Sequence, residues 1–452
     1  MTRFPPGTWI ALSLTLFLAA GQGRCAAAAD FEGRWLGTCE YRGAALPIEL
    51  EFWRHQGALR GRFSSPGMMI LERELETVRQ TGPLLEFEVP GSENTVLQLS
   101  LRGDYLCGIG FPPDLPAIQG ADSAARIQVA LRRAPAAAPP GYRRIEVSIP
   151  VRGARLSGTL YLPASLGRAP AVTLLQGSSE TTREYFRWYA DRFCRAGFVA
   201  LIFDKRGSGR STGNYLAAST AELVADAAAT VRFLKRRAEV DSTRVGIWGL
   251  SQGALLSPRV AAAAPVAFVV AVSGPSISLG EVSTFQDSAR VVEHGFSEAD
   301  GAEAAQGQRE ILRWLREGAR GDRGARARRH AQAKRWFSIS NLSEPLATPE
   351  KLSTWYWSMR TEDPIPAWRA LPCPALILYG ERDDLIPGPL CASVMNQAMK
   401  STASPEVLVR LVPGADHTLR KVMRAGEPFC WPTEADGYFA SVVDWMRRQV
   451  GR

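Results

Sequence analysis

The residues best suited to chemistry lie in the pentapeptide GLSQG at residues 249–253. Ser251 has one glycine two positions before it, Gly249, and another two positions after it, Gly253. An apolar run at 245–248 precedes the pentapeptide and a helix-forming stretch follows it, so Ser251 is predicted on a sharp turn from a strand into a helix. Such a turn would project the serine hydroxyl above the sheet as a nucleophile, and the two glycines would let the turn close.

A serine hydroxyl is a weak nucleophile at neutral pH and needs a base beside it. The sequence has four histidines, His55, His294, His330 and His417. His55 lies in an upstream region of different pattern, while His294 and His330 lie in a polar, charged stretch. His417 follows the apolar run 407–411 by a short loop, as expected for a group at the end of a strand. We therefore predict His417 as the base.

The base needs an acid to orient it. The apolar run 375–379 predicts a buried strand that ends in the loop GERDDLIP at 380–387. Asp383 in this loop is the predicted acid, and Asp384 and Asp416 are the alternatives, which are otherwise expected to be solvated loop carboxylates.

The order serine, acid, histidine and the sequence of the acid loop resemble the α/β-hydrolase superfamily. Its acid loop commonly reads G-x-x-D-x-x-V/I-P, which falls here on Gly380, Asp383, Ile386 and Pro387. The resemblance is to the branch of exported bacterial esterases and of S9 and S33 peptidases. It implies a serine hydrolase in which Ser251, His417 and Asp383 are nucleophile, base and orienting acid.

Two further stretches resemble the same superfamily. QGSS follows the apolar run 171–175 where relatives often carry His-Gly, which implies that the backbone N–H groups of Ser178 and Gln252 form the oxyanion hole. Gln176 departs from the commoner histidine. The segment DKRGSGRS at 204–211 resembles the D-x-R-G-x-G-x-S turn of serine esterases and peptidases, and it lacks the G-x-x-x-x-G-K-[ST] spacing of a phosphate loop.

Apolar runs alternate with helical segments over residues 143–452, the part of the chain that the resemblance covers. This alternation is typical of a mostly parallel sheet covered on both faces. We therefore predict an α/β fold with an eight-stranded α/β-hydrolase sheet, whose strands are at 145–149, 158–162, 171–175, 199–203, 245–248, 267–272, 375–379 and 407–412.

The alternation stops at about 275–368, where the resemblance implies a helical cap over the serine. A cap would shape the substrate pocket, although the aromatic residues 355–357 could instead pack the cap's own core. Upstream, residues 30–133 show short alternating strands, and the proline-rich stretch 134–142 is a linker by composition. This small all-β domain, which could bind substrate or be a structural accessory, resembles the β domain before the hydrolase domain of some exported esterases.

Residues 1–29 have the pattern of a secretory signal peptide. Arg3 precedes an apolar stretch at 9–20, and small residues follow, so cleavage is expected after Ala27 or Ala29. This predicts a periplasmic or extracellular protein without stable membrane insertion once the signal is removed.

The composition describes an ordinary globular protein of two or three domains, with 452 residues, 46% hydrophobic and 22% charged. The net charge of +9 comes largely from the arginine-rich stretch 309–335, which is either a solvated helix face or a surface that attracts acidic substrates. Trp314 lies near the start of this stretch and Trp336 directly follows it, and these aromatic residues do not interleave the cations, so a nucleic-acid role is not expected.

The cysteines have no C-x-x-C spacing and no H-E-x-x-H motif occurs, so no metal site is expected. Among the six cysteines that would remain after signal cleavage, a disulfide between Cys39 and Cys107 is favoured.

The predicted function is a secreted serine hydrolase that cleaves carboxylic ester or thioester bonds of a small acyl substrate, without a cofactor. One alternative is a serine peptidase of the aminopeptidase or prolyl peptidase kind. A peptidase would need a carboxylate pair to anchor the substrate amine, and the sequence shows no such signature. The other alternative is a non-catalytic binding protein with a vestigial triad. The oligomeric state stays open.

Overall fold

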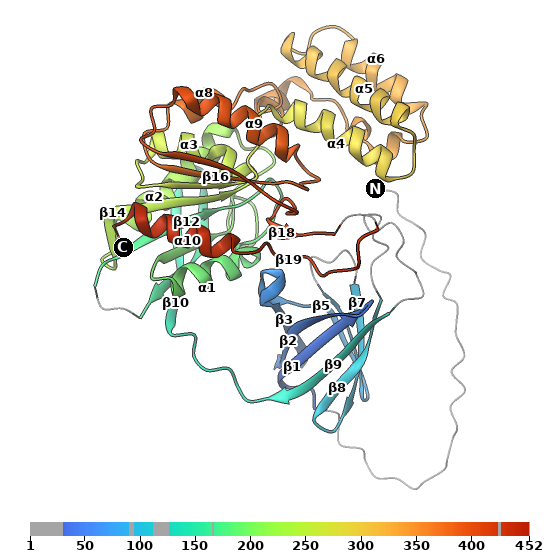
Figure 1. Cartoon of the computed structure of the whole chain (residues 1–452), viewed down its shortest axis with the longest axis vertical. Coiled ribbons are helices and arrows are strands. Elements are labelled where there is room, and N and C mark those ends of the chain that lie inside the picture. Colours follow the sequence, from blue (N-terminus) through green and yellow to red (C-terminus); the bar gives the residue numbers. More distant parts are fainter. Residues whose placement is uncertain (1–29, 90–94, 112–125, 165–166, 424–425, 452) are drawn as a thin grey trace.

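The computed structural model describes residues 30–89, 95–111, 126–164, 167–423 and 426–451. The predicted signal peptide at 1–29 lies outside these ranges. Figure 1 shows a β unit built from the first part of the chain, a larger α/β unit, and a group of helices that projects from the α/β unit.

The first unit is an antiparallel barrel. Within the described ranges its strand order is β4-β3-β2-β1-β9-β8-β7-β6-β5. Only Leu75 separates β4 from β5, and its N–H donates to the Gly61 carbonyl of β3 at 2.9 Å, so β4 and β5 act as one bent strand between β3 and β6. This strand closes the sheet and leaves no free edge. The strands are β1 (Gly33–Tyr41), β2 (Ala44–His55), β3 (Ala58–Ser65), β4 (Ile70–Glu74), β5 (Glu76–Thr81), β6 (Leu84–Val89), β7 (Thr95–Arg102), β8 (Tyr105–Phe111) and β9 (Ile127–Ala134).

The barrel interior is filled by large apolar side chains. Alternate residues of each strand point inward, as period-2 patterning requires, and Trp35, Phe52 and Phe87 are among the most buried side chains of the protein. The predicted all-β unit is therefore confirmed, and it is a packed barrel.

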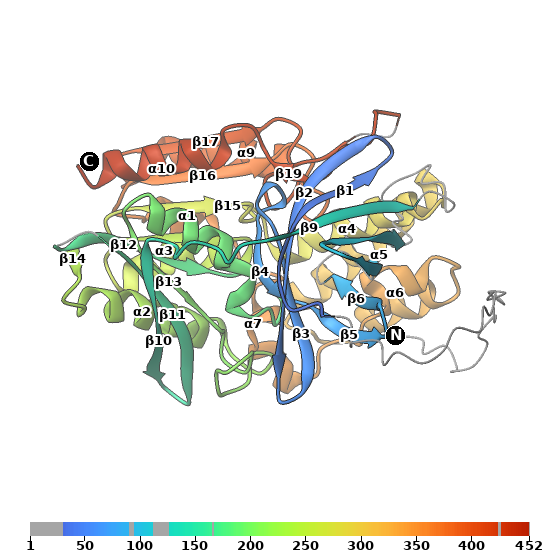
Figure 2. The same cartoon turned by 90° about the horizontal axis from the view of Figure 1, so that it is seen from below.

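The second unit contains the predicted α/β-hydrolase sheet. Its order is β10-β11-β13-β12-β14-β15-β16-β17 among the described residues, with antiparallel pairing of β10 to β11 and of β11 to β13 and parallel pairing from β13 onward. Figure 2 shows β10 and β11 at one end of the sheet and β17 at the other. Each of the eight predicted runs lies in or overlaps a strand, and the mostly parallel fold is confirmed. The strands are β10 (Tyr142–Val151), β11 (Ala154–Pro163), β12 (Ala169–Leu175), β13 (Val199–Phe203), β14 (Val240–Leu250), β15 (Val269–Val272), β16 (Ala375–Gly380) and β17 (Val407–Val412).

Helices cover both faces of this sheet, which explains the continuous apolar strands. One face packs against α1 (Arg187–Arg195) and α10 (Tyr438–Gln449), and the other packs against α2 (Thr220–Lys235), α3 (Gln252–Ala263) and α9 (Gly388–Ala398). The short α8 (Ile365–Arg369) adds Trp368 to the core between the sheet and the helices α2, α3 and α9.

Between β15 and β16 the chain forms the predicted helical insertion. It contains α4 (Leu279–Glu293), α5 (Glu298–Arg316), α6 (Arg323–Gln332) and the short α7 (Trp355–Ser358). The helices α4 to α6 project from the sheet (Figure 1) and have a core of their own around Trp314, Trp336 and Leu342. Short 3₁₀ turns lie at Phe337–Ile339, Asn341–Ser343 and Pro349–Ser353.

Part of the positive charge of the arginine-rich stretch of this insertion is neutralised by ion pairs within the stretch. Arg313 and Arg323 pair with Glu310, and Arg326 pairs with Asp322. These ion pairs fit the interpretation of a solvated helix face.

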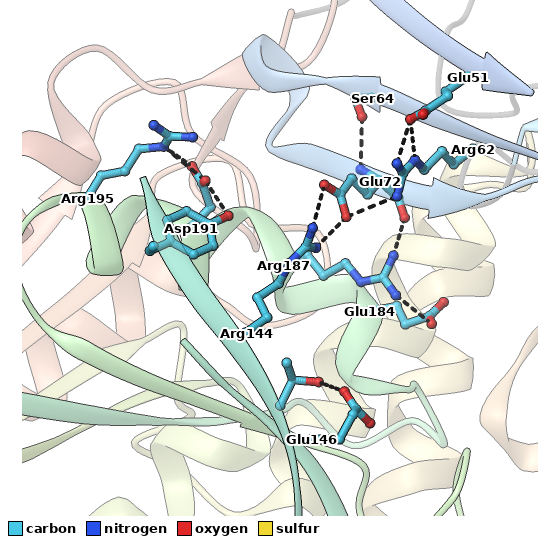
Figure 3. Close-up of polar contacts among 12 residues, drawn as sticks. Glu51, Arg62, Ser64, Glu72, Arg144, Glu146, Glu184, Arg187, Asp191 and Arg195 are labelled. Atoms are coloured by element: carbon cyan, nitrogen blue, oxygen red, sulfur yellow. Dashed lines mark hydrogen bonds and ion pairs between the residues drawn. The ribbon is translucent and has the colours of Figure 1, made fainter. Parts of the chain in front are cut away.

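The barrel docks on the α/β unit through a polar cluster around Glu72 (Figure 3). The Glu72 carboxylate pairs with Arg62 of the barrel and with Arg144 of β10, and the Glu72 carbonyl accepts a hydrogen bond from Arg187 of α1. Next to it, Met69 of the barrel packs into the core of the α/β unit. The two units are thus joined by apolar and ionic contacts together.

A second contact comes from the segment after β17. This segment includes the short strands β18 (Arg420–Lys421) and β19 (Thr433–Glu434). Trp431 donates from Nε1 to the Ala44 carbonyl at 2.9 Å, and Phe429 meets the ring of Tyr41 edge-on with 4.8 Å between ring centres. The chain that follows His417 therefore leans on the barrel.

The favoured disulfide is wrong. All six cysteines of the described residues are free, and Cys39 and Cys107 lie on β1 and β8, which are separated by β9. Two strand spacings amount to roughly 9–10 Å, beyond the reach of a disulfide. In the same ranges, no helix combines the length and apolar character that crossing a bilayer requires.

Candidate active site

Ser251 lies on the predicted turn between β14 and α3. Its backbone has φ 54° and ψ −114°, a strained conformation for a residue with a Cβ, and its N–H donates to the Val272 carbonyl at 2.8 Å. A Cβ at Gly253 would lie 2.2 Å from the Leu175 carbonyl oxygen, and one at Gly249 would lie 2.6 Å from the Gly253 backbone. The turn can therefore close only with glycine at both positions.

Asp383 and His417 are brought together. His417 Nδ1 lies 2.8 Å and 3.0 Å from the two carboxylate oxygens of Asp383, whose side chain is fully buried. The N–H groups of Leu385 and Ile386 both donate to the same carboxylate at 2.9 Å. Because a carboxylate accepts, Nδ1 carries the proton in this contact, and Nε2 of the neutral ring is left as an acceptor.

The sheet places all three residues at one edge. Ser251 follows β14, Asp383 follows β16 and His417 follows β17, and the carboxyl ends of these parallel strands meet at the same edge. The acid and histidine loops touch, since a Cβ at Gly380 would lie 2.3 Å from the Asp416 carbonyl oxygen. No hydrogen bond joins Ser251 to His417 among the described residues, so that contact belongs to the proposal below.

The alternative acids have other surroundings. Asp384 is exposed. Asp416 accepts hydrogen bonds from the backbone N–H groups of Thr418 and Arg420 and pairs with the Arg420 guanidinium, so it stabilises the turn after β17. Of the three, Asp383 is the carboxylate that contacts His417.

The other three histidines are exposed. His55 ends β2, and the His294 ring contacts the Arg290 carbonyl at the end of α4. His330 contacts Glu303 at 2.8 Å in the helical insertion, but two thirds of its side chain is exposed.

The predicted oxyanion loop lies beside Ser251. A Cβ at Gly177 would be 3.5 Å from the Ser251 Cβ, and Gln252 is the first residue of α3, where a backbone N–H has no partner within its helix. Gln176 takes the place of the commoner histidine, and its Nε2 donates to the Phe203 carbonyl. The N–H groups of Ser178 and Gln252 stay predictions as oxyanion donors.

Comparison with known proteins decides the family. Residues 168–421 match the family described as serine aminopeptidase, S33. The chain belongs to this family. The predicted membership in the α/β-hydrolase superfamily is thereby confirmed.

Curated relatives of this S33 family member include esterases and thiohydrolases. The thiohydrolase aneE of Aspergillus aculeatus is 31% identical over 111 residues, which are 24% of this chain and 34% of that protein. The esterase EstD of Thermotoga maritima is 30% identical over 144 residues, which are 30% of this chain and 34% of that protein. The chain thus spans about a third of the length of these relatives.

Among solved structures, the acetyl xylan esterase 1 of a Thermoanaerobacterium species is similar to the chain, with 19% identity and a TM-score of 0.43. The similarity covers 68% of this chain and 84% of that one.

The turn after β13, residues 204–211, stabilises the structure around the candidate site. Asp204 accepts from the N–H groups of Arg183 and Arg210, at 2.8 Å and 3.0 Å. Arg206 forms a buried two-pronged pair with Asp226 of α2, with both distances 2.7 Å. The turn therefore connects the chain that follows the oxyanion loop to α2, and its glycines allow the backbone to follow this path.

Sequence reasoning missed two residues behind the oxyanion loop. Lys205 Nζ donates to the Gly177 carbonyl at 2.6 Å and lies 4.0 Å from the centre of the Tyr215 ring. The Tyr215 hydroxyl donates to the Ser178 carbonyl at 2.6 Å. Burial lowers the pKa of Lys205 to about 7. The only sequence signal was the position of Lys205 inside the turn motif.

Sequence reasoning also missed a pair of carboxylates. Glu293 of α4 has its pKa raised, first by partial burial and then by the charge of Asp384. The pKa of Asp384 is also raised, first by partial burial and then by the charge of Asp383, while His417 acts in the opposite direction. Glu293 is 91 positions from Asp384 in the sequence, so no local pattern could have joined them. Within the described ranges, no group of three or more histidine, cysteine, aspartate or glutamate residues could hold a metal ion.

Proposed function

We propose that the chain is a serine hydrolase that cleaves carboxylic esters through a covalent acyl-enzyme. The observation that supports this most is the buried Asp383–His417 pair at the sheet edge that carries the strained Ser251. A hydroxyl at such a turn, an imidazole with Nε2 as acceptor and a carboxylate on Nδ1 are the parts that acyl transfer needs.

In the proposed reaction, Ser251 Oγ attacks the ester carbonyl while His417 Nε2 takes the hydroxyl proton. Asp383 holds the Nδ1–H and stabilises the imidazolium. The backbone N–H groups of Ser178 and Gln252 would bind the oxyanion. The imidazolium then protonates the leaving alcohol, and water, activated by the same imidazole, releases the acid and restores the serine.

The substrate is proposed to be a small acyl ester or thioester. The names of the relatives, an esterase and thiohydrolases, support this class. The test is a series of p-nitrophenyl esters and matched thioesters of increasing acyl length, with Ser251→Ala as the control. We expect turnover that depends on acyl length and is absent in the variant. No turnover of any member by the folded protein would contradict the proposal and favour a binding protein with a vestigial triad.

An aminopeptidase is the second candidate, because the charges of Glu293 and Asp384 act on each other and Asp384 directly follows Asp383, so this pair of carboxylates is a candidate anchor for a substrate amine. The family description also points to this activity. Aminoacyl p-nitroanilides with a free amine, compared with their N-acetylated forms, would decide. Faster cleavage of the free-amine series than of acyl esters, lost in Glu293→Gln, would favour the peptidase.

Export is also part of the proposal, and it rests on the sequence pattern of residues 1–29 alone. Amino-terminal sequencing of the protein from fractionated cells tests it. A mature chain that begins at residue 28 or 30 outside the cytoplasm is expected, and an uncut chain in the cytoplasm would contradict export.

A further inference from the structure

Two neighbouring carbonyl groups of the oxyanion loop are held by side chains from the segment after β13. Lys205 Nζ donates to the Gly177 carbonyl, and the Tyr215 hydroxyl donates to the Ser178 carbonyl, both at 2.6 Å. Tyr215 lies between Lys205 and Trp355, with 5.1 Å between its ring centre and that of Trp355. The back of the oxyanion loop is thus fixed by a stack of three buried side chains.

The contact with the Gly177 carbonyl also determines the orientation of the whole peptide between Gly177 and Ser178. In a trans peptide the C=O and the N–H point in opposite directions. The Gly177 carbonyl and the Ser178 N–H belong to the same peptide, so a donor that holds the carbonyl also fixes where the N–H points. Gly177 lies against Ser251, and in the proposed function the Ser178 N–H donates to the carbonyl oxygen of the substrate, which becomes the oxyanion.

The Lys205 ammonium is buried in a position that disfavours its charge. The residue is 8% exposed, and no carboxylate within the described ranges forms an ion pair with it. The charged groups around it are Glu180, which favours its charged form, and the paired Arg206 and Asp226, which line the same small cavity. Burying a cation without an ion pair costs free energy and lowers its pKa, to about 7 here.

A negative charge that develops near the 177–178 peptide would offset this cost. A cation on the carbonyl side polarises the peptide and strengthens its N–H as a donor. The gain is larger when the oxyanion has formed than when the ground-state ester is bound, which is the condition for a contribution to kcat.

We propose that Lys205 is a positioning residue of the oxyanion hole. Lys205 holds the 177–178 peptide so that the Ser178 N–H faces the oxyanion, and its charge polarises that peptide as the oxyanion forms. This inference rests on the proposed serine hydrolase function. Lys205 acts through the peptide and does not touch the substrate.

A cavity of about 30 Å³ adjoins Lys205 and is lined by Gln176, Gln252 and Leu256, among others. Gln176 Oε1 and Gln252 Nε2 are buried there without a hydrogen-bond partner. A cavity of this size has room for one water. Lys205→Arg is the conservative variant, because it keeps the charge and the donor.

The test compares Lys205→Met with Lys205→Arg and with Lys400→Met, an exposed lysine far along the chain. Two quantities are measured for each: hydrolysis of p-nitrophenyl butyrate, and the inhibition constant of an alkyl trifluoromethyl ketone, which forms a tetrahedral oxyanion on the serine. For Lys205→Met we expect kcat to fall about 10- to 100-fold with KM changed less than about threefold, and the inhibition constant to rise by a similar factor. Lys205→Arg should keep kcat within about fivefold and Lys400→Met within about twofold.

A folded Lys205→Met protein with unchanged kcat would overturn the proposal, and so would a fall in kcat without weaker ketone binding, which would indicate a merely structural role. If Lys205→Met does not fold, Lys205→Gln carries the same two measurements and the same expectations. Failure of the proposed function is recognised separately, because Ser251→Ala would then keep the wild-type rate.

Discussion

The barrel and the α/β unit both bury large apolar cores, but they differ in where polar side chains are buried. Among the described residues of the barrel, the buried polar side chains are those of Ser64, Ser65 and Thr95. The α/β unit buries many more, and those around the carboxyl edge of its sheet include Gln176, Asp204, Lys205, Arg206, Gln252, Ser273, Asp383, Asp416 and His417.

Buried polar groups cost free energy unless they are hydrogen-bonded, so their concentration at one edge calls for a reason. The proposed chemistry at that edge would supply it. The barrel has no such concentration, and its recorded contacts with the rest of the chain are with β10, α1 and the segment after β17. We infer that substitutions at the sheet edge change activity, whereas substitutions in the barrel change stability.

The largest effect is expected at Ser251. Ser251→Ala removes the proposed nucleophile without disturbing the turn, so kcat for p-nitrophenyl butyrate should fall about 10³-fold or more while the melting temperature is unchanged. Steady-state kinetics and thermal unfolding measure both. A folded variant with wild-type turnover would place the chemistry elsewhere.

Asp383→Asn should have the next largest effect. The amide cannot stabilise the imidazolium and favours the wrong tautomer of His417, so a loss in kcat of about 10²-fold or more is expected. Asp384→Asn is the matched control when the substrate is p-nitrophenyl butyrate, which has no amine for Asp384 to bind, because this exposed neighbour forms no hydrogen bond with the His417 ring among the described residues. Equal losses in the two variants would contradict the assignment of the acid.

Trp35→Ala tests the barrel side of the comparison. Trp35 is fully buried in the barrel core and donates from Nε1 to the Phe31 carbonyl at 2.9 Å. Its removal should lower the free energy of unfolding by about 3–5 kcal/mol. Under conditions where the variant stays folded, kcat should be within about twofold of wild type. Denaturant titration and kinetics give the two values. A large loss of kcat in a fully folded variant would show that the barrel takes part in the reaction.

Glu72→Gln tests the contact between the barrel and the α/β unit. We expect the free energy of unfolding to fall by about 1–2 kcal/mol at pH 7. Burial opposes the charged form of Glu72, yet Arg144, Arg62 and Arg187 hold its pKa below the usual 4.5. Because the pKa of Glu72 is lower in the folded state, its carboxylate stabilises the fold at pH values above the unfolded-state pKa. This stabilisation is lost as the pH falls through the folded-state pKa. The difference between wild type and variant should therefore shrink below about pH 4.5. Unfolding titrations at pH 7 and pH 3.5 measure it, and a difference that grows in acid would contradict the ion-pair interpretation.

The smallest effect is expected at His330. It pairs with Glu303 like a catalytic dyad, but on an exposed face of the helical insertion. His330→Ala should change stability by less than about 0.5 kcal/mol and leave kcat unchanged. A clear loss of activity would mean that the insertion supplies a second base.

Features that depend on local sequence could be predicted. The turn at Ser251 follows from an apolar strand, two glycines and a helix-forming stretch, and the strands β12 to β17 follow from short apolar runs. Asp383 and His417 could be chosen because each follows such a run.

Features that depend on contacts between distant segments could not be predicted from the sequence. The barrel closes because the chain continues through Leu75 from β4, which pairs with β3, to β5, which pairs with β6, and the pairing of β1 with β9 separates Cys39 from Cys107. Lys205 reads as one more cation in a polar turn, and only the packing of that turn against the oxyanion loop brings it to Gly177. Hydrophobic periodicity carries no information about such contacts.

The most direct measurement of the central claim is covalent labelling of the folded protein with a fluorophosphonate, followed by intact-mass analysis and peptide mapping. A fluorophosphonate phosphonylates a serine only when a base activates its hydroxyl. We expect one adduct per chain, on Ser251, that is absent in Ser251→Ala and strongly slowed in His417→Ala. An adduct on another residue, or ester hydrolysis that persists with Ser251 unlabelled, would contradict the assignment.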